Sequence, residues 1–328
     1  MFFKSILLRT AAAIMTAAML VAVGLHNVEP YDVERPNDCA LHFSVMSDVH
    51  TEGNNYTRYK VLTHALRDVG KNKSGSDAVV FLGDNTMNGF AGEQLLFHGA
   101  VKALLRTDRI LPALGNHDIG NGKGDYDELM NRWYTYTEAF FGRHLEHPYY
   151  CEVIDGYSFI ILGTEAQTSN TMRVTDAQFT WLEETLGKAA ESGKPAFVFL
   201  HHPTVAAEDE NGKRTDRLTD MLAAYNREHD LFCFTGHTHQ DLRLSSFRTY
   251  NGFPQASLPC LTRLTGEKDN VTTDDTGIGL EVEVYADEVV LRGRDFYRGR
   301  WKNEPDSETP CAVRYALKDS AQPAPGME

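Results

Sequence analysis

Five short apolar runs constrain this chain most, because each one ends in a polar segment that contains aspartate, asparagine or histidine. In chain order they are ALHFSVMSDVH, DAVVFLGDN, ILPALGNHD, PAFVFLHHP and DLFCFTGHTH. Short apolar runs bounded by turn residues are typical of buried strands. Segments with apolar residues at helical spacing lie between them, such as YKVLTHALRDVG and GEQLLFHGAVKALLR. This alternation predicts an α/β layered domain with helices outside a mixed sheet.

Two hairpins and the composition of the chain ends complete the predicted organisation. The β-rich runs on either side of Asp155-Gly156 predict one hairpin, because Asp-Gly is a strong signal for a tight turn. The segment GLEVEVYADEVVLRGRDFYR predicts another that turns near Asp287. We expect one domain over residues 40–301, with a polar linker at 25–39 before it and a polar tail at 302–328 after it.

The first 24 residues differ in character from the rest of the chain. Lys4 and Arg9 precede the uncharged stretch AAAIMTAAMLVAVGL, and the small residues Ala22 and Gly24 suit a cleavage site. This order is typical of a signal peptide, and the apolar stretch is short against the roughly 20 residues of a spanning helix. We therefore expect export. The protein is either secreted after cleavage, or anchored at the cell envelope with membrane contact through segment 1–24. A soluble N-terminal helix is the alternative.

The net charge of −14 restricts the partners that the chain can have. A chain this acidic is not expected to bind nucleic acid non-specifically, and it does not attract phosphate esters at long range. Phosphate chemistry would need a local cationic centre, which metal ions can provide. The five cysteines show no C-x-x-C spacing, which argues against a thiolate zinc site. Cys233 lies in an apolar run, as a small buried hydrophobic residue would.

Residue types that bind metals follow all five predicted strands. If strand geometry persists after LFCF, His237 and His239 project to the same side, since residues i and i+2 share a face. Any one strand end could be an ordinary turn, because aspartate, asparagine and glycine form turns. In α/β sheets, however, ligands bind beyond the carboxyl ends of the strands. The residues that would meet there are Asp48, His50, Asp84, Asn116, His117, Asp118, His201, His237 and His239.

The donor atoms of this set suit two metal ions better than one. Two carboxylates, one amide oxygen and four imidazoles are too many ligands for one ion that keeps an open position, and no thiolate is among them. Mixed nitrogen and oxygen ligands are accepted by Mn²⁺, Fe²⁺, Zn²⁺ and Co²⁺, and the sequence does not choose among these ions. Two ions roughly 3.5–4 Å apart can clamp an in-line displacement at phosphorus.

The series D-x-H, G-D, G-N-H-D, H-x-P and G-H-x-H, in this order, resembles the calcineurin-like metallophosphoesterase superfamily over about residues 42–240. The resemblance implies a four-layered α/β/β/α sandwich of two mixed sheets with flanking helices, and a dimetal site at the C-terminal ends of the strands. It also implies hydrolysis of a small phosphate ester, diester or monoester and possibly nucleotide-like. A metal-bound hydroxide at the dinuclear centre would be the nucleophile.

The same resemblance implies a role for each residue. Asp48, His50 and His239 would hold one ion, Asn116, His201 and His237 the other, and Asp84 would bridge both. His117 would donate to the leaving group or steady a phosphoryl oxygen, with Asp118 orienting it. A one-residue slip of the H-x-P register would exchange His201 for His202. The first motif is D-x-H rather than the D-x-G of purple acid phosphatases, and no tyrosine closely follows Asp84, so a tyrosine-bound ferric ion is not expected.

The sequence leaves two alternatives open, one for the function of the fold and one for the loop after the first motif. A non-catalytic, metal-stabilised binding protein could carry the same fold, although the intact His117 and the complete ligand set favour an enzyme. The loop TEGNNYTRYK offers Asn54, Asn55, Arg58 and Lys60 to a phosphate or leaving group, or it is simply a solvated loop and helix start.

Overall fold

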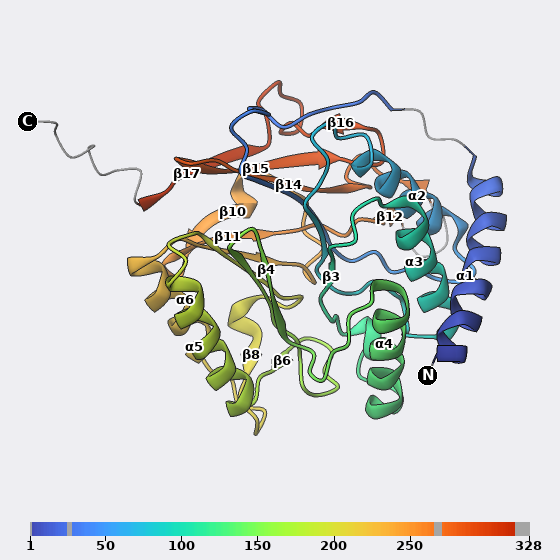
Figure 1. Cartoon of the computed structure of the whole chain (residues 1–328), viewed down its shortest axis with the longest axis horizontal. Helices are drawn as coiled ribbons and strands as arrows, with labels where there is room; N and C mark the ends of the chain where they lie inside the picture. The colour runs from blue at the N-terminus through green and yellow to red at the C-terminus, as the bar shows by residue number, and fades with distance from the viewer. Residues whose placement is uncertain (1, 25–27, 266–270, 319–328) are drawn as a thin grey trace, which may run out of the picture.

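The computed structural model describes residues 2–24, 28–265 and 271–318. Two mixed sheets face each other and helices cover their outer faces, which gives the α/β/β/α order of layers (Figure 1). The predicted fold class is therefore confirmed.

The first sheet has the order β16-β15-β14-β1-β2-β3, and β17 also pairs with β15. Strands β1, β2 and β3 run parallel to one another, whereas β14 runs antiparallel to β1. Their bounds are β1 Leu41–Met46, β2 Ala78–Phe81, β3 Ile110–Pro112, β14 Ile278–Val284, β15 Glu288–Asp295, β16 Arg300–Trp301 and β17 Ala312–Ala316. The predicted second hairpin is the pair β14–β15.

The second sheet has the order β10-β11-β9-β7-β5-β4, with β5, β7, β9 and β11 parallel. Its bounds are β4 Tyr150–Ile154, β5 Tyr157–Ile161, β7 Ala196–Phe199, β9 Leu231–Thr235, β10 Phe247–Tyr250 and β11 Phe253–Ser257. The predicted Asp155-Gly156 hairpin is β4–β5, and both turn residues have positive φ. Two short pairs complete the strands, β6 Met172–Arg173 with β8 Ala207–Glu208, and β12 Leu264–Thr265 with β13 Val271–Thr272.

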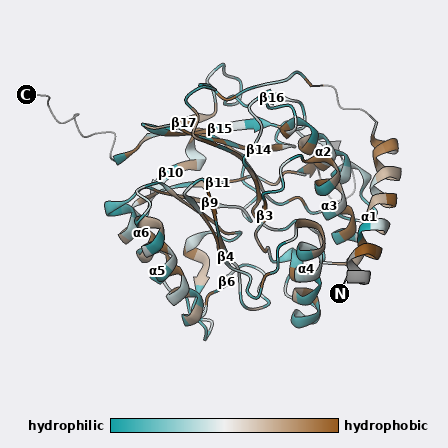
Figure 2. Cartoon of the chain, in the orientation of Figure 1, coloured by the Kyte–Doolittle hydropathy of each residue, from teal (hydrophilic) through white to brown (hydrophobic). Residues whose placement is uncertain are grey.

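The apolar runs of the sequence form the layer between the sheets, where Figure 2 shows the brown strands lying inside. Phe43 of β1 packs its ring edge-on to Phe159 and Phe197 of the second sheet, with centroids 4.9 and 5.0 Å apart. These rings are fully buried. Aromatic contacts of this kind stabilise the packing of the two sheets in addition to the effect of burying apolar area. They hold the strand ends of one sheet in a fixed position relative to those of the other.

Helices pack on both outer faces. On the first sheet lie α2 Tyr56–Val69 and α3 Ala91–Leu104, with α4 Tyr126–Phe141 beside them, and on the second lie α5 Asp176–Ala190 and α6 Arg217–Glu228. Asn55 begins α2, because its side chain accepts a hydrogen bond from the Arg58 backbone N–H. Such a cap stabilises a helix by about 1 kcal/mol. Asn55 therefore belongs to the helix start.

Both ends of the chain pack more closely on the domain than the sequence indicates. In the predicted linker, Tyr31 and Val33 are buried. In the predicted tail, residues 312–316 form β17 and pair with β15, so the sheet continues past Trp301. The helix α1 Phe2–Val23 packs on α3, with Ala12 and Thr16 buried. Among the described residues no helix is both long and apolar enough to cross a membrane. Residues 25–27 of the linker and 319–328 of the tail lie outside the described residues.

Candidate metal centre

The C-terminal ends of strands from both sheets bring the predicted residues together. Asp48, His50, Asp84, His237 and His239 all have positive φ, between 45° and 68°, and they are five of the nine non-glycine residues with this conformation in the described chain. Positive φ is uncommon outside glycine, and it clusters at functional sites. His237 and His239 therefore converge through left-handed backbone after β9 ends at Thr235, not through continued strand alternation as the sequence suggested.

The first group of ligand atoms comes from Asp48, His50, Asp84 and His239. The Nε2 atom of His239 lies 2.9 Å from Asp48 Oδ1 and 3.1 Å from His50 Nε2. His50 Nε2 lies 3.7 Å from Asp48 Oδ1 and 3.8 Å from Asp84 Oδ2. Ligand atoms of the four residues all lie within 4.8 Å of one another, which is the geometry that one ion requires.

A second group shares Asp84 with the first. Ligand atoms of Asp84, His201 and His237 also lie within 4.8 Å of one another. His201 Nε2 is 3.2 Å from Asp84 Oδ2 and 3.1 Å from Asn116 Oδ1, and His237 Nδ1 is 3.0 Å from the same amide oxygen. All seven predicted ligands therefore come together, with Asp84 between the two groups. Their coordination of metal ions stays a prediction.

The residues present fit divalent cations. Asp48 and Asp84 are fully buried, and no lysine or arginine in the described part of the chain forms an ion pair with either carboxylate. Buried carboxylates need compensating charge. Carboxylate, amide and imidazole donors together suit Mn²⁺, Fe²⁺, Zn²⁺ or Co²⁺.

Burial and nearby carboxylates shift the pKa values of two ligand histidines in opposite directions. Burial dominates at His50 and lowers its pKa to about 3, so its ring is neutral and able to ligate. At His201 burial acts in the same direction, but Asp84 and Asp48 outweigh it and raise the pKa to about 9. The pKa of Asp84 lies below its usual value, because His201 outweighs the opposing effect of burial. Asp84 and Asp48 thus favour positive charge at His201.

Surrounding backbone fixes the two aspartates. Asp48 Oδ2 accepts hydrogen bonds from the Ser47 hydroxyl at 2.5 Å and the His237 backbone N–H at 3.0 Å. Asp84 Oδ1 accepts one from the His117 backbone N–H at 2.7 Å. A Cβ atom at Gly236 would lie 2.0 Å from the Ser47 hydroxyl oxygen, so only glycine allows this approach. The G-H-x-H glycine is therefore required by packing.

The predicted orientation of His117 by Asp118 is wrong. His117 Nδ1 bonds to the Met87 backbone carbonyl at 2.7 Å. The buried Asp118 carboxylate instead accepts hydrogen bonds from the backbone N–H groups of Gly115 and Thr86 and from the Thr86 hydroxyl. Burial, with Asp84 nearby, raises the pKa of Asp118 to about 6. Asp118 therefore holds the loops after β2 and β3 together, and Met87, which no side-chain motif reveals, orients His117.

His201, and not His202, lies in a group of ligand atoms. His202 is buried behind His237, with ring centroids 4.5 Å apart, and it belongs to neither group of ligand atoms. Sequence reasoning missed Cys260, whose Sγ lies with ring nitrogens of His50 and His239 in a third group. Cys260 follows β11 outside any histidine or aspartate motif, so its spacing carries no signal.

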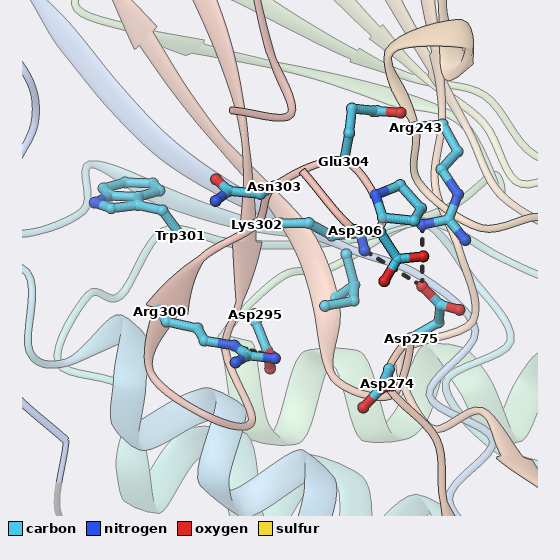
Figure 3. Close-up of a pocket in the computed structure, with 12 residues that line it drawn as sticks. Arg243, Asp274, Asp275, Asp295, Arg300, Trp301, Lys302, Asn303, Glu304 and Asp306 are labelled. Carbon is cyan, nitrogen blue, oxygen red and sulfur yellow. Dashed lines mark hydrogen bonds and ion pairs between the residues drawn. The ribbon is translucent and has the colours of Figure 1, made fainter. Parts of the chain in front are cut away.

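A hydrogen bond and several ion pairs connect the candidate metal centre to a cavity. Arg263 donates to the His239 carbonyl at 3.1 Å and pairs with Asp241. Asp241 pairs with Arg243, which lies 3.6 Å from Asp275, and Lys302 lies 3.3 Å from the same carboxylate (Figure 3). The cavity measures about 440 Å³ and is lined mostly by charged residues. These pairs fix the loop that carries His239.

Similar proteins support the assignment that this geometry suggests. A profile of calcineurin-like phosphoesterases matches residues 41–241. Over 212 residues the chain is 28% identical to a probable glycerophosphodiester phosphodiesterase from Arcobacter nitrofigilis, and the alignment covers 60% of this chain and 70% of that relative.

Two solved structures share the fold. Purple acid phosphatase from yellow lupin (Lupinus luteus) seeds superposes with a TM-score of 0.56 at 12% identity, over 92% of this chain and 58% of the lupin chain. A dimetal phosphatase from Danio rerio gives a TM-score of 0.51 at 15% identity, over 78% of this chain and 96% of that chain. At these identities the likeness concerns the fold alone.

The family profile covers well over half of the 328 residues and includes every predicted ligand. The predicted resemblance is confirmed, and the protein is a phosphoric ester hydrolase. The chain belongs to the calcineurin-like phosphoesterase family.

Proposed function

We propose that this enzyme hydrolyses a small phosphodiester at a dinuclear metal centre. Asp48, His50 and His239 would hold one ion, Asn116, His201 and His237 the other, and Asp84 both. The observation that carries the proposal is the pair of ligand groups that share the buried Asp84. A single site would not need the second group.

Divalent ions bound there would lower the pKa of a water molecule towards about 7 and offset charge on the phosphoryl oxygens. The protein's own contribution is to keep the ligands fixed and largely buried. Asp48 and Asp84 are held by backbone N–H groups, and Asn116 Oδ1 lies within hydrogen-bonding distance of two ring nitrogens. Preorganised ligands of this kind need no rearrangement during the reaction.

His117 is the best placed group to serve the leaving oxygen. Its Nδ1 lies against the Met87 carbonyl, so this nitrogen carries the proton. The ring lies edge-on to His50, 4.7 Å away between centroids, and it is only half buried. Its Nε2 is therefore the atom left to meet a substrate. In the imidazolium form it donates a proton to the departing alkoxide, and in the neutral form it accepts one.

We choose a diester over a monoester as the substrate class. The relative from Arcobacter nitrofigilis is named as a probable glycerophosphodiester phosphodiesterase, which favours this choice. We also propose that the protein is exported, as its N-terminal residues predict.

The test compares bis-p-nitrophenyl phosphate with p-nitrophenyl phosphate. Metal-stripped wild type is reloaded with Mn²⁺, Zn²⁺, Fe²⁺ or Co²⁺, and Asp84→Asn is treated in the same way. The control is Asp108→Asn, whose carboxylate is exposed and pairs with Lys102. We expect metal-dependent turnover that favours the diester and is lost only in Asp84→Asn. Full metal loading without turnover of either ester or of glycerophosphodiesters would instead support the non-catalytic binding protein.

A further inference from the structure

A cysteine thiol lies inside the metal centre. Cys260 follows β11 and is 3% exposed. Its Sγ and one ring nitrogen each of His50 and His239 all lie within 4.8 Å of one another. No other cysteine in the described ranges belongs to such a group. The corner of the site next to the first ligand group therefore offers one sulfur and two imidazole nitrogens.

This thiol does not pack as an ordinary core residue. Cys233 and Cys311 are also buried, and each packs within a cluster of apolar side chains. Cys260 belongs to none of the apolar clusters, although it is equally inaccessible. Its Sγ donates a hydrogen bond to the Asp48 carbonyl at 3.1 Å. The side chain is thus directed at the polar end of β1 rather than into the core.

Backbone pairing fixes the thiol relative to the ligands. The Leu261 backbone N–H donates to the Ser47 carbonyl at 2.9 Å, and the Thr262 hydroxyl donates to the Val49 carbonyl at 2.7 Å. Segment 260–262 therefore runs alongside segment 47–49, which leads directly into His50. Cys260 is therefore held in place relative to His50, and no loop has to close for its thiol to reach an ion bound there.

We propose that His50, His239 and Cys260 form a binding group for thiophilic metal ions that overlaps the first ligand group. Thiolate with imidazole is the donor set that Zn²⁺, Cd²⁺ and Cu⁺ prefer, whereas Mn²⁺ prefers carboxylate oxygens. Both histidines are shared, so a thiophilic ion that takes Cys260 competes with an ion that relies on Asp48 and Asp84. Coordination replaces the thiol proton, which leaves to solvent. The inference rests on the proposed metal centre for its two histidines.

The five cysteines show no C-x-x-C spacing, which argued against a thiolate zinc site. That rule concerns ligands on one turn, and the three residues here are brought together from β1, β9 and β11 by the fold. The group gives the enzyme selectivity among metal ions by their affinity for sulfur as well as by their size.

The test is ultraviolet absorption of the metal-stripped full chain during titration with Cd²⁺. Thiolate coordination gives a ligand-to-metal charge-transfer band that imidazole and carboxylate ligands do not. We expect this band in the wild type and in the matched control Cys233→Ser, but not in Cys260→Ser. We also expect Cys260→Ser to bind Cd²⁺ more weakly than the wild type does. A band that persists in Cys260→Ser would overturn the proposal.

A second measurement needs no variant and stays informative if Cys260→Ser does not fold. Zinc X-ray absorption on the zinc-loaded wild type should show one sulfur at about 2.3 Å per chain. Only nitrogen and oxygen neighbours would overturn the proposal. If Mn²⁺ still binds at two ions per chain in that case, the dinuclear centre stands and only the thiolate ligand fails. If neither Mn²⁺ nor Cd²⁺ binds, both proposals fail.

Discussion

Two buried histidines lie beside carboxylates near the two ends of β1, and only one of them has a closed set of partners. At the start of β1, His42 places Nε2 2.5 Å from Glu281 and Nδ1 2.8 Å from the Gly75 carbonyl. Just beyond its end, His50 has no partner for Nδ1, and its Nε2 faces His239, Asp48 and Asp84. A complete set of partners leaves His42 no free lone pair for a ligand.

The carboxylates differ in the same way. Glu281 accepts hydrogen bonds from the Tyr31 hydroxyl at 2.6 Å and the Ser44 hydroxyl at 3.1 Å, in addition to His42. Nearby, Arg294 forms two hydrogen bonds with Asp68, at 2.7 and 2.9 Å. Asp84, in contrast, lies against two histidines that also approach other ligand atoms. We infer that the network around Glu281 contributes to stability and the group around Asp84 to chemistry, and each prediction below tests that division.

The largest effect is expected for Asp84→Asn. Loss of the shared carboxylate removes a charge that both ions need, so kcat should fall on the order of 10³-fold or more. The metal-free variant should also lose some stability, because the buried Asp84 carboxylate lies 3.2 Å from His201, so kcat is compared per folded molecule. Turnover assays and thermal melts on the same preparation check this. A variant that keeps wild-type kcat would remove Asp84 from the mechanism.

His117→Gln tests the proposed acid–base role of His117, which belongs to none of the groups of ligand atoms. General acid catalysis contributes about 10²–10⁴-fold, so kcat should fall by that amount while two ions remain bound. Metal content is measured by mass spectrometry alongside kcat. Loss of metal from His117→Gln would show that this histidine is a ligand instead.

Glu281→Ala should mainly lower the free energy of unfolding, whereas Asp84→Asn should mainly lower kcat. It leaves His42 and Tyr31 without their buried partner, and breaking a buried pair in this way costs about 3–5 kcal/mol of unfolding free energy. Denaturant unfolding measures the loss. We expect kcat per folded molecule to stay near wild type at low temperature. A large kcat defect in fully folded Glu281→Ala would end the separation of the two regions.

The smallest effect concerns pH. Burial opposes the charge on His42, but Glu281 outweighs it and raises the His42 pKa above its ordinary value. The charged pair therefore stabilises the fold fully below about pH 6.5, and the contribution is lost as the pH rises through the raised pKa. Denaturant unfolding between pH 5 and 9 should show this decline in the wild type and a flatter profile in His42→Gln. Equal slopes would contradict the pairing.

Much of the site could be predicted from sequence, because it depends on strand ends that apolar runs mark clearly. Asp48, Asp84 and Asn116 each follow such a run. The sequence could not reveal contacts made by backbone or by distant segments. The Met87 carbonyl has no side-chain signature, and Cys260 reaches the site only because residues 260–262 pair with residues 47–49. Strand β17 was missed because its five residues, AVRYA, are half-exposed or exposed and lie in a polar, proline-bearing segment.

The most direct test of the account is the number of Mn²⁺ ions bound per chain, measured by equilibrium dialysis on metal-stripped wild type and Asp84→Asn. The shared position of Asp84 predicts two ions in the wild type, and one or none at the same free Mn²⁺ concentration in the variant. One ion in the wild type, or two tightly bound ions in Asp84→Asn, would contradict a dinuclear centre bridged by this carboxylate.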